Sequence, residues 1–411
     1  MVIIAIRRFA FMLAGLSLLT GCFGGNGTTA ATSAPTSTAN VTTVTVDSGP
    51  SSANGQINHA YVTVKVCEPG TQTCASIDHV LLDTGSTGLR LVGSVLTAQK
   101  VALPKETDSQ GQTIEECMSF TGGQTWGPVV LADVYLAGEQ ASKAPLQLMD
   151  DANSAAPAPA TCGANGTLMN AATGFGANGV LGVGVFLQDC GQGCVSNSAP
   201  LPVYYGCSSA GACTAENTAL ALQVSNVVAQ FASDNNGVIV NLPNLANANG
   251  DATVQGELIF GLGTQSDNML PATLTVLGVD GSGNFHANYN GSTTALPALI
   301  DSGTDSFAFN DSTIAVCSSG SFIGYYCPTV APLAVSTVNT GLGQYTGSAT
   351  VNFAIGDPNT FVAGATAFSG LGGGAGSTYF IWGMPFFFGR QIYVGIEQRS
   401  GGSYTGPFYA Y

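Results

Sequence analysis

Two six-residue stretches decide the fold: Leu81–Ser86 reads LLDTGS and Leu299–Thr304 reads LIDSGT. At average residue frequencies, an Asp-[Ser/Thr]-Gly-[Ser/Thr] motif begins at a given position with a chance on the order of one in ten thousand. Two copies behind aliphatic pairs therefore indicate an internal repeat more strongly than two unrelated surface turns. An aliphatic strand that ends in an Asp-x-Gly turn leaves the carboxylate at the strand end. If the two halves pack face to face, Asp83 and Asp301 meet in one cleft.

Two carboxylates in one cleft have a defined chemistry. At a separation of about 3 Å both cannot ionise, so the pair shares a proton and titrates as a unit. One aspartate then takes a proton from water while the other donates one to a scissile carbonyl, without a metal or a covalent intermediate. The neighbouring hydroxyl groups are suited to orienting the carboxylate oxygens and to joining the two turns.

Composition indicates an exported, mostly β protein of two lobes. The chain has 411 residues, of which 55 are glycine and 45% are hydrophobic, enough for two cored lobes but too rich in glycine for long helices. Only 8% of residues are charged, and 24 acidic residues face 9 basic ones. Such a surface repels nucleic acid and anionic lipid, so neither is an expected partner.

The amino terminus is typical of a bacterial lipoprotein signal. Two arginines precede an apolar segment, Phe9–Leu19, that is too short to span a bilayer. It leads to Leu19–Cys22, LTGC, which resembles the lipoprotein processing box and predicts a signal peptide over 1–21 and lipidation of Cys22. An ordinary signal peptide with a chance cysteine is the alternative. Phe23 favours sorting to the outer membrane. Residues 22–45 offer almost no apolar side chains to bury and predict a flexible, lipidated tether.

The remaining cysteines predict disulfides. Ten cysteines besides Cys22, an even number in an exported chain, indicate five bonds. Short spacing favours the pairs Cys67–Cys74 and Cys317–Cys327, and elimination leaves Cys117–Cys162. Three connectivities stay open for the other four: Cys190, Cys194, Cys207 and Cys213. A zinc site is the competing interpretation, but there is no Cys-x-x-Cys and the three histidines are scattered. We therefore expect no metal and no cofactor.

The chain after the amino-terminal segment is predicted to form mostly β-sheet. Alternating segments such as Tyr61–Val66 are separated by Gly, Asn and Ser turns, and Leu220–Phe231 is the best helix candidate because its apolar residues recur at three- and four-residue spacing. The repeat extends past the aspartates, since Val180–Gly184 follows Asp83 and Phe380–Gly383 follows Asp301. Each half thus offers a strand, an Asp-x-Gly turn and a later apolar strand that ends in glycine.

These paired features resemble the pepsin-like aspartic peptidases, over most of the chain from about Tyr61 onward. With the processing box and the cysteines, the chain looks most like an uncharacterised bacterial lipoprotein branch of them. The resemblance implies a bilobal double β-barrel with a pseudo-twofold axis and a central cleft, with lobes at 46–250 and 251–411. It makes Asp83 and Asp301 the catalytic pair. The supporting residues of the two turns are then Thr84, Gly85, Ser86, Ser302, Gly303 and Thr304.

The flap of that family has an altered counterpart here. The family folds a glycine-rich hairpin over the substrate, and the matching stretch is Ser119–Gly127, with Gly122 and Gly123 at its centre. Phe120 occupies the position of the tyrosine that the family usually has in its flap. Arg90 occupies the position of the tryptophan that usually bonds to this tyrosine. The usual hydrogen bond between tyrosine and tryptophan therefore cannot form. Trp126 is the candidate for a replacement aromatic wall. Asp305 would add a third carboxylate if it faced the cleft.

Two functions of different class follow. The first is an exported, lipid-anchored aspartic endopeptidase, a monomer that cleaves peptide or protein substrates in the cell envelope and contacts the membrane through its lipid only. The second is a non-catalytic lipoprotein that uses the same cleft to bind peptide or glycan. The intact motifs favour the first, and the altered flap favours the second.

Overall fold

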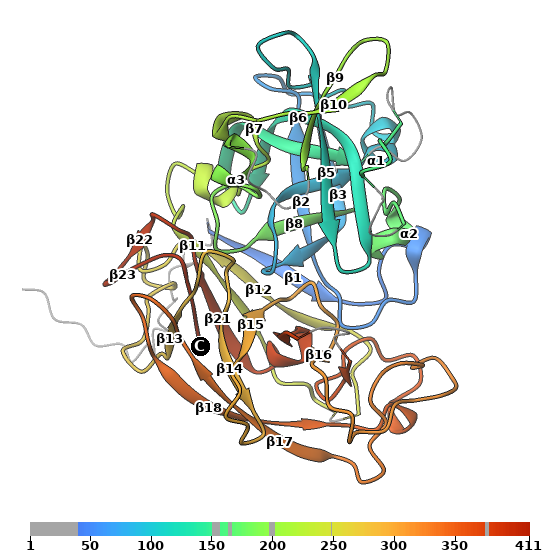
Figure 1. Ribbon diagram of the computed structural model, residues 1–411, viewed down its shortest axis with the longest axis vertical. Helices are drawn as coiled ribbons and strands as arrows, with labels where there is room; N and C mark the ends of the chain where they lie inside the picture. Colours follow the sequence, from blue (N-terminus) through green and yellow to red (C-terminus); the bar gives the residue numbers. More distant parts are fainter. Residues whose placement is uncertain (1–39, 150–156, 163–166, 197–201, 248, 375–377) are drawn as a thin grey trace, which may run out of the picture. The chain divides into compact units, whose positions relative to one another are not determined.

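The structure is a computed structural model that describes residues 40–149, 157–162, 167–196, 202–247, 249–374 and 378–411 (Figure 1). The predicted signal peptide, the lipidation site Cys22 and most of the predicted tether lie outside the described residues. The tether prediction is wrong for 41–45, because Val41–Val46 forms strand β1, antiparallel to β12 (Val254–Phe260). Its Val/Thr alternation buries Val44 and Val46, so this segment does have apolar side chains to bury.

Most of the described chain is sheet. A 15-stranded sheet combines the strands of the first half with several from the second, and the second half alone forms a seven-stranded sheet. In spatial order, the large sheet comprises β10 (Cys213–Ala215), β9 (Tyr204–Cys207), β5 (Thr113–Phe120), β6 (Gly123–Leu136), β7 (Glu139–Met149), β4 (Thr87–Val92), β8 (Gly179–Val183), β3 (Cys74–Asp83), β2 (Ala60–Cys67), β1, β12, β11 (Gly237–Leu242), β21 (Arg390–Gly395), β24 (Phe408–Ala410) and β13 (Val276–Gly278).

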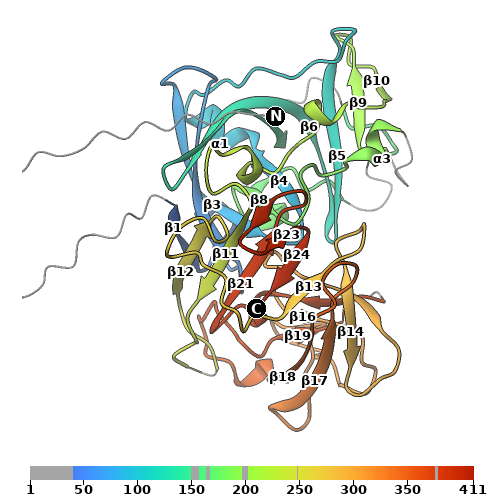
Figure 2. The ribbon, with the colours of Figure 1, turned by 90° about the vertical axis from the view of Figure 1, so that its left-hand side faces the viewer.

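The second sheet lies in the lower half of Figure 1. Its spatial order is β18 (Ser348–Ile355), β17 (Leu333–Thr340), β14 (Phe285–Tyr289), β15 (Leu296–Ile300), β20 (Phe380–Trp382), β16 (Phe307–Ala308) and β19 (Gly372–Gly373), and a separate ribbon pairs β22 (Ser400–Gly401) with β23 (Tyr404–Thr405). Figure 2 shows β1, β12, β11, β21 and β24 side by side, with strands from both ends of the chain in one sheet.

The two halves repeat one arrangement around their aspartates. In the first half β3 runs parallel to β8, and β8 runs antiparallel to β4. In the second half β15 runs parallel to β20, and β20 runs antiparallel to β16. In each half, the strand that leads to the aspartate therefore lies parallel to a strand from later in the same half. The expectation of a mostly β chain built from two related halves is confirmed.

Helices are few and short. They are α1 (Gly93–Ala98), α2 (Ala172–Phe175) and α3 (Gln192–Val195), with 3₁₀ turns η1 (Ser51–Ala53), η2 (Leu220–Leu222), η3 (Val228–Gln230), η4 (Pro358–Thr360) and η5 (Met384–Phe386). Among the described residues, no helix has the length and apolar character needed to cross a membrane.

The predicted helix at 220–231 is wrong. Only two separate 3₁₀ turns form there, and the chain between them is extended. The backbone N–H groups of that stretch find partners outside a helix: Val224 donates to the Tyr204 hydroxyl at 2.8 Å and Asn226 to the Leu187 carbonyl at 2.9 Å. The apolar spacing is instead satisfied by burial of Val224, Val227 and Val228 against neighbouring sheet.

Five disulfides join the described cysteines. The three predicted pairs, Cys67–Cys74, Cys117–Cys162 and Cys317–Cys327, are confirmed. The four cysteines whose pairing the sequence left open form the bonds Cys190–Cys194 and Cys207–Cys213. Each of these bonds spans a sequence separation of 10 or less except Cys117–Cys162, which spans 45.

Candidate active site

The two Asp-x-Gly turns meet where the halves face each other. Asp83 ends β3 and is buried, and Asp301 directly follows β15 and keeps part of its surface accessible. A Cβ added to Gly85 would lie 2.6 Å from Cγ of Asp301, and one added to Gly303 would lie 2.9 Å from Cγ of Asp83. Only glycine fits at these positions, so each turn packs its backbone directly against the other turn's carboxyl group.

Each carboxyl group is held by the same pair of donors. The Gly85 amide donates to Oδ1 of Asp83 at 2.8 Å, and the Ser86 hydroxyl donates to Oδ2 at 2.5 Å. In the second half the Gly303 amide donates to Oδ1 of Asp301 at 2.8 Å, as the first bond of an equivalent pair. The second bond comes from the Thr304 hydroxyl to Oδ2 at 2.6 Å. The glycine and the second hydroxyl of each motif thus orient its carboxylate.

The first hydroxyl of each motif joins the turns. The Thr84 amide donates to Oγ of Ser302 at 3.1 Å, and the Ser302 amide donates to Oγ1 of Thr84 at 3.0 Å. The Thr84 hydroxyl donates to the Ile300 carbonyl at 2.8 Å, and the Ser302 hydroxyl to the Leu82 carbonyl at 2.7 Å. All four groups are buried, so this reciprocal set fixes one turn relative to the other.

Burial and mutual repulsion oppose ionisation of both aspartates. The pKa of Asp301 is raised well above its usual value, first by burial and then by the charge of Asp83 and a side-chain hydrogen bond with it. The bonds from Thr304 and Gly303 oppose this rise. Because two carboxyl groups in contact cannot both ionise readily, the two aspartates share one proton.

Glycines let the later strands pass directly behind the turns. Gly182 lies opposite Asp83 in the β3–β8 register, and a Cβ there would lie 2.8 Å from the Ser86 hydroxyl oxygen. In the second half the Asp301 amide donates to the Trp382 carbonyl at 2.9 Å, and a Cβ on Gly383 would lie 2.1 Å from the Ser306 carbonyl oxygen. The apolar strand ending in glycine therefore crosses behind the turn in both halves, as predicted.

Two cavities flank the aspartates beneath the tip of the β5–β6 hairpin. Asp83, Asp301, Phe120 and Thr121 line both of them. The first has a volume of ≈ 200 Å³ and is further lined by Leu81, Met169, Phe175, Val180, His59 and Gly122. The second has a volume of ≈ 470 Å³ and is further lined by Arg90, Asp189, Phe186, Leu299, Tyr379 and Ile381. The hairpin predicted from Ser119–Gly127 thus lies over the aspartates, with Phe120 at the tip.

The aromatic wall predicted from Trp126 is not in the cleft. Trp126 is 1% exposed and its ring contacts Tyr205 with centroids 5.4 Å apart, away from both cavities. Alternation along β6 sends its side chain to the opposite face from the cleft. Phe175 lines the first cavity instead and meets Phe120 edge to face at 5.1 Å. The interpretation of Trp126 as a cleft residue is wrong.

Asp305 is not a third member of the pair. Its carboxylate accepts a hydrogen bond from the Tyr325 hydroxyl, and it is not among the groups that shift the pKa of Asp301.

Gly123 lets the hairpin pack closely against a neighbouring segment, because a Cβ there would lie 2.2 Å from the Thr167 carbonyl oxygen. Among the described residues, no cluster of three or more His, Cys, Asp or Glu is placed to hold a metal ion.

Sequence reasoning missed Tyr409, on β24 near the far end of the chain. Tyr409 is buried and its hydroxyl donates to the Thr84 carbonyl at 3.3 Å. Burial raises the pKa of Tyr409, and the charges of Asp301 and Asp83 raise it further, so its hydroxyl stays protonated behind the pair. No sequence motif marks Tyr409, because its contact with Thr84 depends on the pairing of β24 with β21 and β13.

Comparisons with known proteins agree with this architecture. The crystal structure of an aspartic proteinase from Irpex lacteus is similar, with a TM-score of 0.50 and 15% sequence identity over 90% of this chain and 96% of that one. At this identity the likeness shows the fold alone, a pepsin-like arrangement. No curated protein matches the sequence. A family model matches residues 36–411. The chain belongs to the family described as "Protein of unknown function (DUF3443)".

Proposed function

We propose that the protein is an aspartic endopeptidase that hydrolyses peptide bonds with Asp83, Asp301 and a water molecule. The observation that carries the proposal is the duplicated hydrogen-bond set that orients the two facing carboxyl groups, one of them with a raised pKa. A peptidase of this kind needs one ionised and one protonated carboxyl group at the same time. The pair provides both, between two cavities that can take side chains on either side of a bound peptide bond.

The reaction follows from these two states. The ionised aspartate takes a proton from the water, and the water oxygen forms a bond to the carbonyl carbon. The protonated aspartate gives its proton to the carbonyl oxygen, so no charged oxyanion accumulates. The carbon–nitrogen bond then breaks, and the leaving amine receives the proton that the first aspartate took from the water. As the carbonyl forms again, one hydroxyl group of the tetrahedral intermediate returns its proton to the second aspartate. The pair returns to its starting state with one proton.

The test is cleavage of a broad fluorogenic peptide library from about pH 3 to about pH 8. Removing an aspartate that acts as acid or base is expected to lower kcat by about 10²–10⁴-fold. Asp83→Asn and Asp301→Asn should both fold and fail to cleave, and pepstatin-type inhibitors should block the wild type. Asp305→Asn is the matched control, since its carboxylate bonds to Tyr325 outside the pair, and it should cleave normally. Wild type and Asp83→Asn behaving alike on every peptide would exclude catalysis.

A binding protein is the second candidate. The observation that favours it is Arg90, a buried cation with two carboxylate partners on the wall of the larger cavity. A binding role needs the cleft and not the proton relay, so wild type and Asp83→Asn would bind the same peptides or glycans equally well without cleavage. Equilibrium binding measured on both variants separates the two functions.

We also propose that the protein works outside the cytoplasm, anchored through lipid on Cys22 in the outer membrane, as a monomer. The five disulfides are typical of such a location. Cys22→Ser should leave the protein soluble after export, whereas the wild type should fractionate with membranes and take up a labelled fatty acid. Equal membrane association of both variants would contradict the lipid anchor.

A further inference from the structure

A charged cluster lies at the base of the hairpin that covers the aspartates. Arg90 on β4 is completely buried, and its Nη2 contacts Oε1 of Glu116 at 2.5 Å and Oδ2 of Asp189 at 2.8 Å. Glu116 lies on β5, a strand of the hairpin, and Asp189 follows β8. Tyr204 on β9 donates to Oδ1 of Asp189 at 2.7 Å. The cluster thus joins the hairpin to three other parts of the first half.

Arg90 also reaches both the first aspartate turn and the hairpin tip. Its Nη1 donates to the Thr87 carbonyl at 2.8 Å, one residue past Ser86, which holds Asp83. Its guanidinium carbon lies 5.7 Å from the centroid of the Phe120 ring, within range of a cation–π contact. One side chain therefore contacts the aspartate turn, the base of the hairpin and the residue at its tip.

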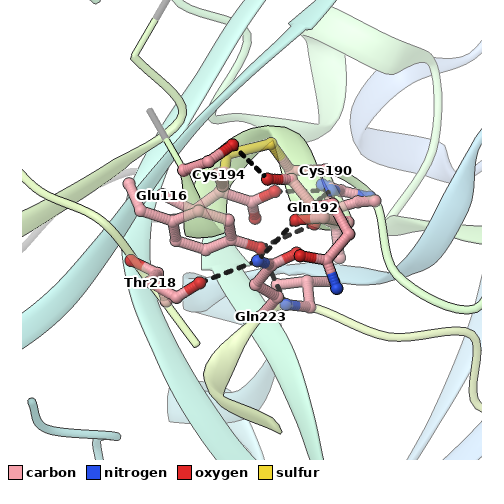
Figure 3. The surroundings of a disulfide bond; sticks show 12 residues. Glu116, Cys190, Gln192, Cys194, Thr218 and Gln223 are labelled. Atoms are coloured by element: carbon pink, nitrogen blue, oxygen red, sulfur yellow. Dashed lines mark hydrogen bonds and ion pairs between the residues drawn. A yellow bond between two sulfur atoms is a disulfide. The ribbon is translucent and has the colours of Figure 1, made fainter. Parts of the chain in front are cut away.

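The loop that carries Asp189 is itself fixed. Figure 3 shows Glu116 beside the Cys190–Cys194 disulfide, which closes the loop directly after Asp189. Gln223 donates from Nε2 to the carbonyls of Gly191 at 3.0 Å and Thr218 at 2.8 Å. The loop directly after Asp189 is therefore held by bonds that do not involve the cluster.

The charges of the cluster do not balance without a proton. Two carboxylates face one guanidinium, and all three side chains are 0–1% exposed, so full ionisation would bury a net negative charge. Oε2 of Glu116 is buried and has no hydrogen-bond partner among the described residues. One proton shared by the two carboxyl groups makes the cluster neutral.

The titration behaviour agrees with this arrangement. The pKa of Asp189 is raised well above its usual value, first by burial and then by the charge of Glu116 and a hydrogen bond with it, while Arg90 and Tyr204 oppose the rise. Burial alone would lower the pKa of Arg90, but Glu116 and Asp189 raise it, so the guanidinium stays charged. The pKa of Tyr204 is raised by burial, Asp189 and Glu116, so its hydroxyl stays a donor.

We propose that Arg90, Glu116 and Asp189 are positioning residues that hold the β5–β6 hairpin over the two aspartates, and that loss of the proton shared by Glu116 and Asp189 releases it. Only the consequence for catalysis rests on the proposed peptidase function. When pH rises, the pair becomes doubly ionised, its members repel each other, and the hairpin strand that carries Glu116 separates from the fixed Asp189 loop. The hairpin is closed in acid and opens toward neutral or basic pH.

The experiment measures hydrogen exchange at the hairpin tip, over the segment 118–124, between about pH 4 and about pH 8. Protection factors relative to the intrinsic exchange rate remove the direct effect of pH. With one proton linked to opening, wild-type protection should fall by about 10-fold per pH unit above the apparent pKa of the pair. Glu116→Gln keeps an acceptor for Arg90 and a donor to Asp189 but cannot ionise, so its protection should not change with pH.

Two further variants complete the design. Arg90→Met removes the cation and should give a poorly protected tip at every pH. Glu257→Gln makes the same chemical change as Glu116→Gln on the exposed β12 side chain and should follow the wild type. Wild-type protection that is constant with pH would overturn the shared-proton release. A protected tip in Arg90→Met would overturn the positioning role of the cluster.

Cleavage kinetics separate this inference from the peptidase proposal. In an active enzyme, KM of the wild type should rise above the apparent pKa of the Glu116–Asp189 pair, and KM of Glu116→Gln should not, while their kcat values agree in acid. In Asp301→Asn the hairpin should still open with pH, although cleavage is lost. Absence of cleavage by the wild type contradicts the peptidase alone, whereas equal KM profiles for wild type and Glu116→Gln contradict the hairpin release.

Discussion

At the scale of single residues, the two motifs indicated the site because each of their polar groups has one defined partner. The sequence carries the aspartates, the hydroxyl groups and the glycines in fixed order, and in the structure each makes the contact that its chemistry predicts. The residues that were missed or misread are those whose position depends on distant strands. Tyr409 reaches the turn of Asp83 through sheet pairing, Asp189 lines the larger cavity from the loop after β8, and Trp126 faces away from the cleft.

The bonds between the turns give a prediction at this scale. Thr84→Val keeps the side-chain shape but leaves the Ser302 amide and the Ile300 carbonyl without their partner. Each buried group left unsatisfied costs about 1–3 kcal/mol, so we expect the free energy of unfolding to fall by at least that amount. Urea denaturation with the disulfides intact measures it.

Thr350→Val is the matched control for this change. Thr350 is exposed on β18, and surface substitutions usually change stability by less than about 0.5 kcal/mol. If Thr84→Val and Thr350→Val are equally stable, the bonds between the turns contribute nothing to folding.

At the scale of elements, period-two alternation and the glycine-ended strands were reliable, and helical periodicity was not. In strands such as β2, buried and exposed residues alternate along part of the strand. Leu220–Phe231 has helical spacing but a polar network around Tyr204 and Leu187 supplies partners for its backbone, so an extended path costs no hydrogen bonds. A similar tertiary contact, pairing with β12, made a strand of the segment after Asn40.

The crossing strands give a prediction at this scale. In Gly383→Ala the new Cβ would lie 2.1 Å from the Ser306 carbonyl oxygen and 2.6 Å from that of Thr304, and both are backbone atoms. Overpacking of this kind costs about 1–3 kcal/mol or more, and relief requires the second aspartate turn to move. We expect lower stability in thermal denaturation together with loss of cleavage.

Gly281→Ala serves as the comparison, because a Cβ there has no atom within 4 Å. It should behave as the wild type in both measurements. A Gly383→Ala variant with unchanged activity would mean that β20 can shift without disturbing Asp301.

At the scale of the whole molecule, we expect the folded state to be more stable in acid than at neutral pH. Its net charge of −15 causes self-repulsion that protonation relieves. Buried acids act in the same direction: the pKa values of Asp189 and Asp301 lie well above their usual 3.8, and burial beside Asp108 raises the pKa of Glu216 to about 7.

These shifts give a prediction for stability against pH. Between the unfolded and the folded pKa of each group, the unfolded chain has lost a proton that the folded chain keeps, so the folded state is favoured at lower pH. The free energy of unfolding should therefore fall as pH rises from about 4 through about 7, the window set by the unfolded values and by Glu216. Chemical denaturation at each pH measures this slope.

Asp301→Asn removes one of the groups responsible and should flatten the slope, while Asp305→Asn should leave it as in the wild type. Stability that rises steadily across the same window would show that these acids do not stay protonated in the folded state.

The contact between Tyr409 and the turn of Asp83 has a consequence for the order in which the protein is made. A ribosome completes both aspartate motifs more than a hundred residues before it reaches β24, and an exported chain emerges in the same order. Until Phe408–Ala410 has joined its sheet, a nascent chain carries both acids without the strand that backs them. The turn of Asp83 therefore gains its Tyr409 contact only after both motifs have been synthesised and β24 has paired.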